Sequence, residues 1–143
     1  MNRTASALRG RAAVFPMLLL ALASSSWAAA GTSIDASGVG GGIDDRELRE
    51  PGDSFAEGEK VWFWTRVTGG EPGELLSHVW LLEGEPVLSV ELEVGGPRWR
   101  TWSGKTLHPG SVGGWAVEAR DAEGNVLARA QFRCVPIPGT AAE

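Results

Sequence analysis

The chain has 143 residues, of which 43% are hydrophobic, and a formal net charge of −5 at neutral pH. An acidic balance gives no electrostatic attraction to nucleic acid or to anionic lipid, so both kinds of partner are disfavoured. The sequence contains one cysteine, Cys134, which excludes an internal disulfide.

Residues 1–30 follow the order charged, apolar, small that is typical of a secretory signal peptide. The apolar run spans about a dozen residues, fewer than the roughly 20 of a membrane-spanning helix. An Ala-Ala-Ala stretch offers cleavage after Ala28 or Ala30. We expect a periplasmic or secreted protein without stable membrane insertion; an uncleaved N-terminal anchor is the alternative. Without this segment and its three arginines, ten basic and 18 acidic side chains remain, a net charge of −8.

The next residues differ sharply in composition. Residues 31–42 are rich in glycine and serine and are predicted to be a flexible linker. Residues 43–53 are charged and end at a Pro-Gly pair, which indicates a short edge strand or an extended lead-in, with a helical turn as the alternative.

From Phe55 onward, apolar and polar residues alternate with the period of a β-strand. The predicted strands are residues 60–67, 76–82, 87–94, 98–103, 115–120 and 126–135. Glycine- and proline-containing turns separate them. In the last strand the predicted inward set is Val126, Ala128, Ala130, Phe132 and Cys134. Cys134 is therefore expected to be a buried, inert thiol.

Six or seven short strands with turns about every 8–12 residues, and no convincing helix, indicate an all-β fold. We predict a single antiparallel immunoglobulin-like β-sandwich over residues 43–137, followed by a C-terminal tail, 138–143. A small barrel is the alternative.

The segment from Arg98 to Lys105 is the most unusual in an otherwise acidic domain, because it holds three cationic residues within eight positions. The alternation places Arg98, Arg100 and Trp102 on one face of a strand. Guanidinium groups beside an indole suit carboxylates, phosphates or acidic sugars, so this segment is a candidate binding strip for an anionic glycan or an acidic peptide. The structural alternative pairs the arginines with Glu91 and Glu93 of the preceding strand.

Two further groups are candidates for the site. His78 and Trp80 share a strand face, where they either belong to the core or join the cationic segment, with Ser103, in a ligand site. Trp62 and Trp64 share the face opposite Phe63 and are a candidate interface with another chain.

The sequence gives little support to catalysis or to cofactor binding. Ser103 with His78 is the only nucleophile–base pair that can be assembled, and no spacing requires the two to meet. Neither metal-ligand spacing nor a phosphate-binding glycine loop is present. We therefore expect a non-catalytic module without a cofactor. A hydrolase that uses Ser103 or a pair of carboxylates is the alternative.

Several motifs together resemble a bacterial family known as domain of unknown function 2914. These motifs are Arg49-Glu50-Pro51, Val61–Thr65, His78–Trp80, Arg98–Lys105 and Gly114–Val117, with a closing Phe132. The resemblance covers about residues 43–135, although Gly104 stands where a serine or similar residue is expected. It implies a bacterial, extracytoplasmic or membrane-associated setting and supplies no established activity.

These features together favour a non-catalytic binding module of the bacterial envelope, whose partner is a protein or an anionic polymer. A structural subunit that assembles through Trp62 and Trp64 is a further alternative.

Overall fold

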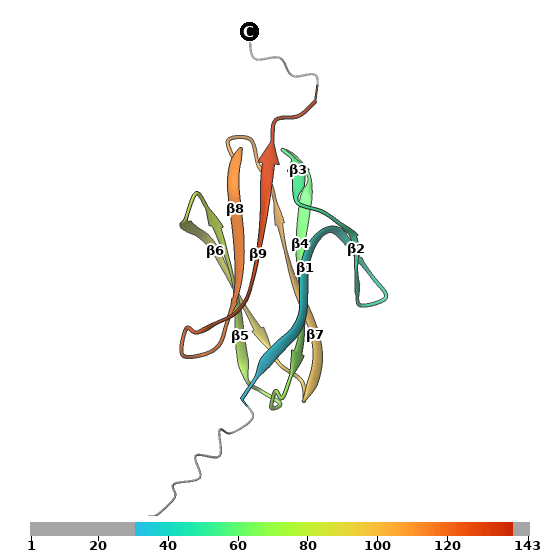
Figure 1. Ribbon diagram of the computed structural model, residues 1–143, viewed down its shortest axis with the longest axis vertical. Coiled ribbons are helices and arrows are strands. Elements are labelled where there is room, and N and C mark those ends of the chain that lie inside the picture. Colours follow the sequence, from blue (N-terminus) through green and yellow to red (C-terminus); the bar gives the residue numbers. More distant parts are fainter. Residues whose placement is uncertain (1–30, 139–143) are drawn as a thin grey trace, which may run out of the picture.

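The computed structural model describes residues 31–138, which form nine strands and no helix (Figure 1). The signal peptide predicted for residues 1–30 lies outside the described residues, as do residues 139–143 of the predicted tail. The strands are β1 (Ser33–Asp44), β2 (Glu47–Pro51), β3 (Ser54–Ala56), β4 (Lys60–Thr68), β5 (Leu75–Leu82), β6 (Glu85–Glu93), β7 (Arg98–Thr106), β8 (Gly113–Arg120) and β9 (Val126–Val135).

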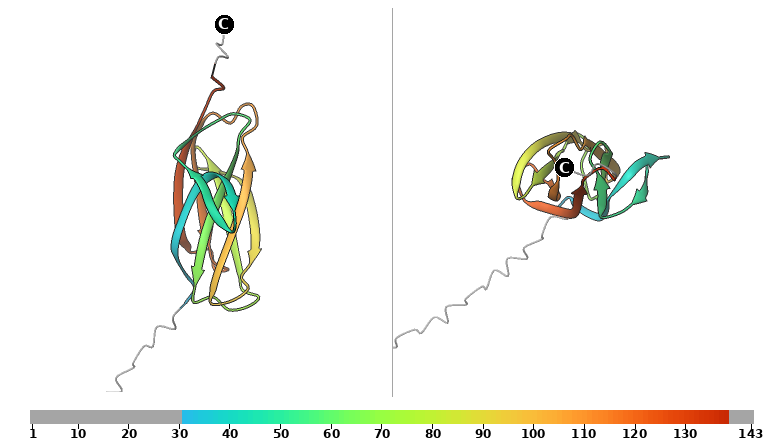
Figure 2. Two further views of the ribbon diagram at one scale, coloured as in Figure 1. Left: turned by 90° about the vertical axis from the view of Figure 1, so that its right-hand side faces the viewer. Right: turned by 90° about the horizontal axis from the view of Figure 1, so that it is seen from above.

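The strands form two sheets that pack as a sandwich, which confirms the predicted all-β class. One sheet has the order β2-β1-β4-β7 and the other the order β3-β9-β8-β5-β6. All neighbouring strands are antiparallel except β3 and β9. Seen from above, the two sheets enclose the core, and the β1–β2 hairpin projects to one side (Figure 2).

All six strands predicted from the alternation are present, and β9 has the predicted bounds. The three strands that the prediction did not separate are β1, β2 and β3. The charged lead-in at residues 43–53 contains the end of β1 and all of β2, whereas β3 follows it, and the described chain has nine strands rather than about seven.

The prediction of a flexible linker at residues 31–42 is wrong, because β1 runs through this segment and pairs with both β4 and β2. The glycines of β1 allow the neighbouring strand β2 to pack closely against it. A Cβ atom at Gly40 would lie 2.4 Å from the carbonyl oxygen of Arg49 and 2.9 Å from the side chain of Leu48. Glycine therefore lets the β2 arm of the hairpin approach β1 closely.

Aromatic side chains fill the centre of the sandwich. The Phe132 ring stacks on Trp115, with 5.8 Å between centroids, and meets Trp80 and Phe55 edge-on at 6.2 and 5.6 Å. Such pairs add to the stabilisation that comes from burying apolar area alone. Three of the six tryptophans outside the predicted signal peptide, Trp64, Trp80 and Trp115, are buried.

One detail of the predicted inward set in β9 is wrong. Val126 is 50% exposed, and Leu127 packs against the core instead. A register shift opposite Ala119 and Arg120 causes the exchange, because one extra residue reverses the faces of a strand. Cys134 is buried as predicted, and burial is the main reason that the pKa of its thiol is raised.

Candidate functional site

The predicted site residues lie in two separate places. Arg98, Arg100 and Trp102 are on the outer face of the four-stranded sheet. His78, Trp80 and Ser103 are buried between the sheets. The sequence therefore predicted correctly which side chains of β7 share a face, but the four-stranded sheet separates the outer group from the buried group.

The buried group forms a continuous chain of hydrogen bonds. The indole Nε1 of Trp80 donates to Ser103 Oγ at 3.2 Å, and Ser103 Oγ lies 2.7 Å from His78 Nδ1. On the other side of the ring, His78 Nε2 lies 3.2 Å from Thr65 Oγ1. Thr65 Oγ1 in turn donates to the carbonyl oxygen of Thr101 at 3.1 Å.

The two ends of this hydrogen-bonded relay, Trp80 and the Thr101 carbonyl, determine which group donates each hydrogen bond. The Trp80 indole can only donate and the Thr101 carbonyl can only accept. Thr65 uses its single proton on that carbonyl, so His78 Nε2 must carry a proton and donate to Thr65. Nδ1 is then an acceptor, and it receives the hydroxyl proton of Ser103. Every polar group of the relay is satisfied when His78 is neutral.

Burial also keeps His78 neutral, because it lowers the pKa of the imidazole to about 3. The relay is therefore a neutral polar core and gives no support to the predicted hydrolase pair. Ser103 is only 6% exposed, and its hydroxyl is already committed to two core partners. Thr65 occupies the place where a catalytic triad would have a carboxylate.

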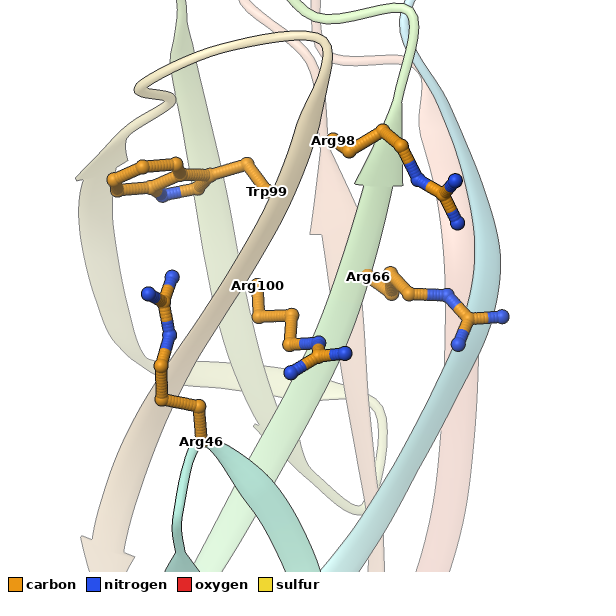
Figure 3. Close-up of a pocket in the computed structure, with 5 residues that line it drawn as sticks. All are labelled: Arg46, Arg66, Arg98, Trp99 and Arg100. Carbon is orange, nitrogen blue, oxygen red and sulfur yellow. The ribbon is translucent and has the colours of Figure 1, made fainter.

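Two residues of the outer group, Arg98 and Arg100, line a cavity of about 270 Å³ together with Arg46, Arg66 and Trp99, and we call it the arginine cavity. Figure 3 shows Arg46 rising from the hairpin turn toward Trp99, while the other three arginines extend across the sheet. Cross-strand register explains part of this cluster, since Arg66 of β4 stands directly opposite Arg100 of β7.

Carboxylates neutralise two of the four arginines. Arg66 makes two hydrogen bonds to Asp35, at 2.8 and 3.1 Å, and this contact is the main reason that the pKa of Asp35 is lowered. Arg100 pairs with Glu47 at 3.0 Å. The predicted structural pairing with Glu91 and Glu93 is wrong, because β6 and β7 belong to different sheets and β7 pairs with β4.

The other two arginines have no carboxylate partner among the described residues. The guanidinium of Arg46 lies over the Trp99 ring, 5.6 Å from its centroid. The side chain of Arg98 is exposed and makes no ion pair or side-chain hydrogen bond with any described residue, although its charge helps to lower the pKa of Asp35. The cavity therefore presents two guanidinium groups that form no direct ion pair with a carboxylate of the described residues.

Lys105 does not belong to this cavity. It shares the inner face of β7 with Ser103, where its Nζ donates to the carbonyl oxygen of Thr106 at 3.2 Å. It also lies 6.0 Å from the Trp115 ring centroid. The predicted grouping of Lys105 with Arg98 and Arg100 is therefore wrong, as the same strand alternation already implied.

Sequence analysis missed Arg46, which occupies an unfavourable place in a tight turn. Asp45 and Arg46 connect β1 to β2 with φ angles of 49° and 62°. A two-residue hairpin turn with two positive φ angles favours glycine at its second position. The turn between β5 and β6 follows this preference, with Glu83 at 49° and Gly84 at 81°. Trp64 holds the Asp45-Arg46 turn on the sheet by donating to the Arg46 carbonyl oxygen at 2.8 Å.

This contact removes Trp64 from the predicted intermolecular interface, whereas the part of Trp62 in such an interface stays a prediction. Trp64 is only 5% exposed, because the protein's own hairpin covers it. Trp62 is half-buried, with the ammonium group of Lys60 4.2 Å from its ring centroid. A Cβ atom at Gly104 would lie 2.9 Å from the Trp62 ring, which explains glycine at this position.

A second cavity of about 410 Å³ shares Arg46, Trp99 and Arg100 with the arginine cavity. We call it the side groove. Its remaining lining comes from Leu92 and Glu93 of β6 and from Thr101 and Trp102 of β7. Of the predicted site residues, Trp102 thus lies beside the arginine cavity without lining it.

Neither a candidate metal site nor a membrane-spanning helix is found in the described part of the chain. Residues 31–138 contain no group of three or more His, Cys, Asp or Glu side chains that could hold a metal ion. They also contain no helix long and apolar enough to cross a membrane.

Comparison with known proteins finds a family similarity for part of the chain. The model of the family described as "Protein of unknown function (DUF2914)" matches residues 74–134, and this confirms the resemblance seen in the sequence. The matched segment contains Arg98 and Arg100 but not Arg46 or Arg66.

The chain was also compared with curated proteins and with solved structures. No curated protein matches the chain. Among solved structures, the chain is similar to the crystal structure of a Niemann-Pick type C2 protein from Japanese carpenter ant, with 10% sequence identity and a TM-score of 0.43. That similarity covers 74% of this chain and 92% of the ant protein chain.

Proposed function

We propose that the protein is a non-catalytic, extracytoplasmic binding module of the bacterial envelope, and that the arginine cavity is its working surface. The partner is an anionic envelope polymer or an acidic protein segment. We also propose that the sandwich is of the immunoglobulin-like kind, in keeping with its two packed sheets of short strands.

One observation carries the binding proposal. Four arginines from β4, β7 and the β1–β2 turn line a single cavity, although the chain as a whole is acidic. Clustered like charges repel one another, so such a cluster is costly without an anion to offset it. Planar guanidinium groups recognise carboxylate and phosphate oxygens with two parallel hydrogen bonds.

The non-catalytic part of the proposal draws on the state of the candidate nucleophile. Ser103 and His78 are buried, and neither lines any of the five cavities described by residue, which include the arginine cavity and the side groove. Arginine remains protonated at any physiological pH, so the four guanidinium groups can bind an anion but cannot act as general bases. The extracytoplasmic part depends on the signal-like residues 1–30 and their order of charged, apolar and small residues.

The test is binding to immobilised polyanions, with polygalacturonate and polyphosphate as probes, at low and moderate salt. Arg98→Ala should weaken retention strongly, because Arg98 is exposed and unpaired in the cavity. Arg133→Ala is the matched control, since Arg133 is also exposed and lies on β9 in the other sheet. Equal retention of the two variants, or no retention of the unmodified protein, would overturn the proposal.

A further inference from the structure

We propose that the side groove binds an uncharged sugar ring, so that the partner of the protein is a glycan and not an acidic protein segment. This inference rests on the proposed function and narrows its choice of partner. Three features of the groove carry it: a tryptophan without a partner, a carboxylate without a partner, and a balance of charge.

Trp102 is the one tryptophan among residues 31–138 whose side chain has no specific partner. The other five each donate a hydrogen bond or hold a cation against the ring, and they are Trp62, Trp64, Trp80, Trp99 and Trp115. No side-chain hydrogen bond, cation–π contact or ring pair joins Trp102 to a described residue. Because Trp102 is half-buried and lines the groove, its aromatic surface and its indole N–H remain available to a ligand.

Trp99, the second tryptophan of the groove, holds Arg46 in place. A Cβ atom at Gly95 would lie 2.4 Å from the Trp99 ring, so glycine lets this ring pack against the backbone. The guanidinium of Arg46 lies 5.6 Å from the centroid of the same ring. Figure 3 shows Arg46 and Trp99 on one side of β7, whereas Arg98 extends to the other side. The groove therefore receives the guanidinium of Arg46 and not that of Arg98, which lines the arginine cavity.

The charges that line the groove balance one another. Arg46 and Glu93 form no ion pair with a described residue, and they contribute one positive and one negative charge. Arg100 is matched by Glu47 at 3.0 Å. A sugar hydroxyl both donates and accepts, so the hydroxyl groups of one ring can accept from Arg46 and donate to Glu93. Glu93 would repel a carboxylate or a phosphate at the same place.

The size and the apolar lining of the groove also suit a sugar ring. Its volume of about 410 Å³ lies within the usual range for a small-molecule site. The face of the Trp102 ring carries partial negative charge, which attracts the C–H groups on one face of a sugar, and Leu92 adds apolar surface. A purely aliphatic ligand would leave Arg46 and Glu93 without hydrogen-bond partners. An acidic peptide would bring a carboxylate against Glu93.

The experiment is calorimetric titration of the protein with three uncharged hexasaccharides, cellohexaose, maltohexaose and hexa-N-acetylchitohexaose, and with hexaglutamate. The three sugars differ in linkage and substituents, and they share uncharged rings with C–H faces. We expect at least one of them to bind. Raising the salt concentration should leave this affinity nearly unchanged, because an uncharged ligand forms no ion pair. The binding of hexaglutamate to the arginine cavity should weaken with salt.

Substitutions in the groove locate the sugar. Trp102→Ala should weaken its binding about tenfold or more, because the contact with the ring is lost. Trp62→Ala is the matched control, since Trp62 is also half-buried on the outer face of this sheet and lines none of the five cavities described by residue. Glu93→Ala should weaken binding more than Glu93→Gln, whose amide oxygen still accepts a hydrogen bond. Glu93 is exposed, so these two variants test the groove even if Trp102→Ala does not fold.

The failure of this inference can be told apart from the failure of the proposed function. If none of the three sugars binds, or if Trp102→Ala binds them as well as Trp62→Ala does, the glycan assignment is overturned. If Trp102→Ala weakens and Glu93→Gln strengthens the binding of hexaglutamate, the groove receives an acidic protein segment instead. Arg98→Ala should leave sugar binding unchanged, because Arg98 does not line the groove. The proposed function itself fails only if polyanion retention does not depend on Arg98.

Discussion

His78 Nδ1 lies 2.7 Å from Ser103 Oγ, in the interior of the sandwich between β5 and β7. The contact joins the two sheets through a neutral pair, since the Trp80–Ser103–His78–Thr65 relay is fully satisfied only when the imidazole is uncharged. Buried polar groups that are completely paired make a core specific, and losing one partner leaves the other unsatisfied. The pair is thus a structural link between the sheets.

The first prediction concerns pH. The pKa of His78 is about 3 in the folded protein and about 6.5 when unfolded, so the unfolded chain binds the extra proton between these values. Stability is complete above pH 6.5 and is lost as the pH falls toward 3. The free energy of unfolding should therefore fall by about 2 kcal/mol between pH 7 and pH 5, as measured by urea denaturation.

Substitution of each histidine checks the source of this loss. His78→Gln should remove most of the difference between pH 7 and pH 5, whatever its own stability. His108→Gln should keep the full difference, because His108 is exposed in the loop between β7 and β8. If His78→Gln retains the pH dependence of the unmodified protein, another group causes it.

The second prediction concerns Ser103. Ser103→Ala removes the acceptor of the Trp80 indole and the donor to His78, and it leaves two buried polar groups unpaired. We expect a loss of about 2–4 kcal/mol in the free energy of unfolding. Ser89→Ala, at an exposed position of β6, should change it by less than about 0.5 kcal/mol. Similar values for the two variants would mean that the relay contributes nothing to stability.

The third prediction compares two glycines of β1. Gly40→Ala would place a Cβ atom 2.4 Å from the Arg49 carbonyl oxygen, so we expect a loss of about 1–3 kcal/mol and a displaced hairpin. At Gly42 the nearest atom would be 3.9 Å away, an ordinary contact. Gly42→Ala should leave stability unchanged or raise it by up to about 1 kcal/mol. Thermal unfolding of both variants is the measurement, and equal melting temperatures would contradict the close packing of the hairpin.

The fourth prediction concerns the thiol of Cys134. The side chain is buried, and burial raises its pKa, so little reactive thiolate is accessible in the folded protein. A chromogenic thiol reagent should label the folded protein very slowly and the protein in denaturant at once. Rapid labelling under native conditions would mean that the β3–β9 edge of the sheet opens readily.

Strand alternation predicted most of the fold, because each strand has one face toward the core and one toward water. It could not reveal β1, whose glycines have no side chain to alternate. It also could not reveal the register shift near Leu127, because a single extra residue depends on the neighbouring strand. In both cases the information lies in the pairing partner and not in the segment itself.

The candidate site was predictable only in part. Arg98 and Arg100 stand out as a basic segment in an acidic chain, and the structure places both in the arginine cavity. Arg46 and Arg66 are far from them in sequence, and they join the cavity only because β1 and β7 flank β4. Counting the charged residues along the sequence cannot reveal a cluster that forms only when the strands take their order in the sheet.

The four arginines of the cavity come from two different parts of the chain. The segment that matches the family begins at residue 74, and two of the cavity's arginines precede it. Arg46 lies in an exposed turn of a hairpin that projects from the sandwich (Figure 2). Under the proposed function, a change of side chain at that turn would alter which anion is accepted and would leave the Trp64 hydrogen bond in place, because that bond uses the backbone carbonyl oxygen of Arg46.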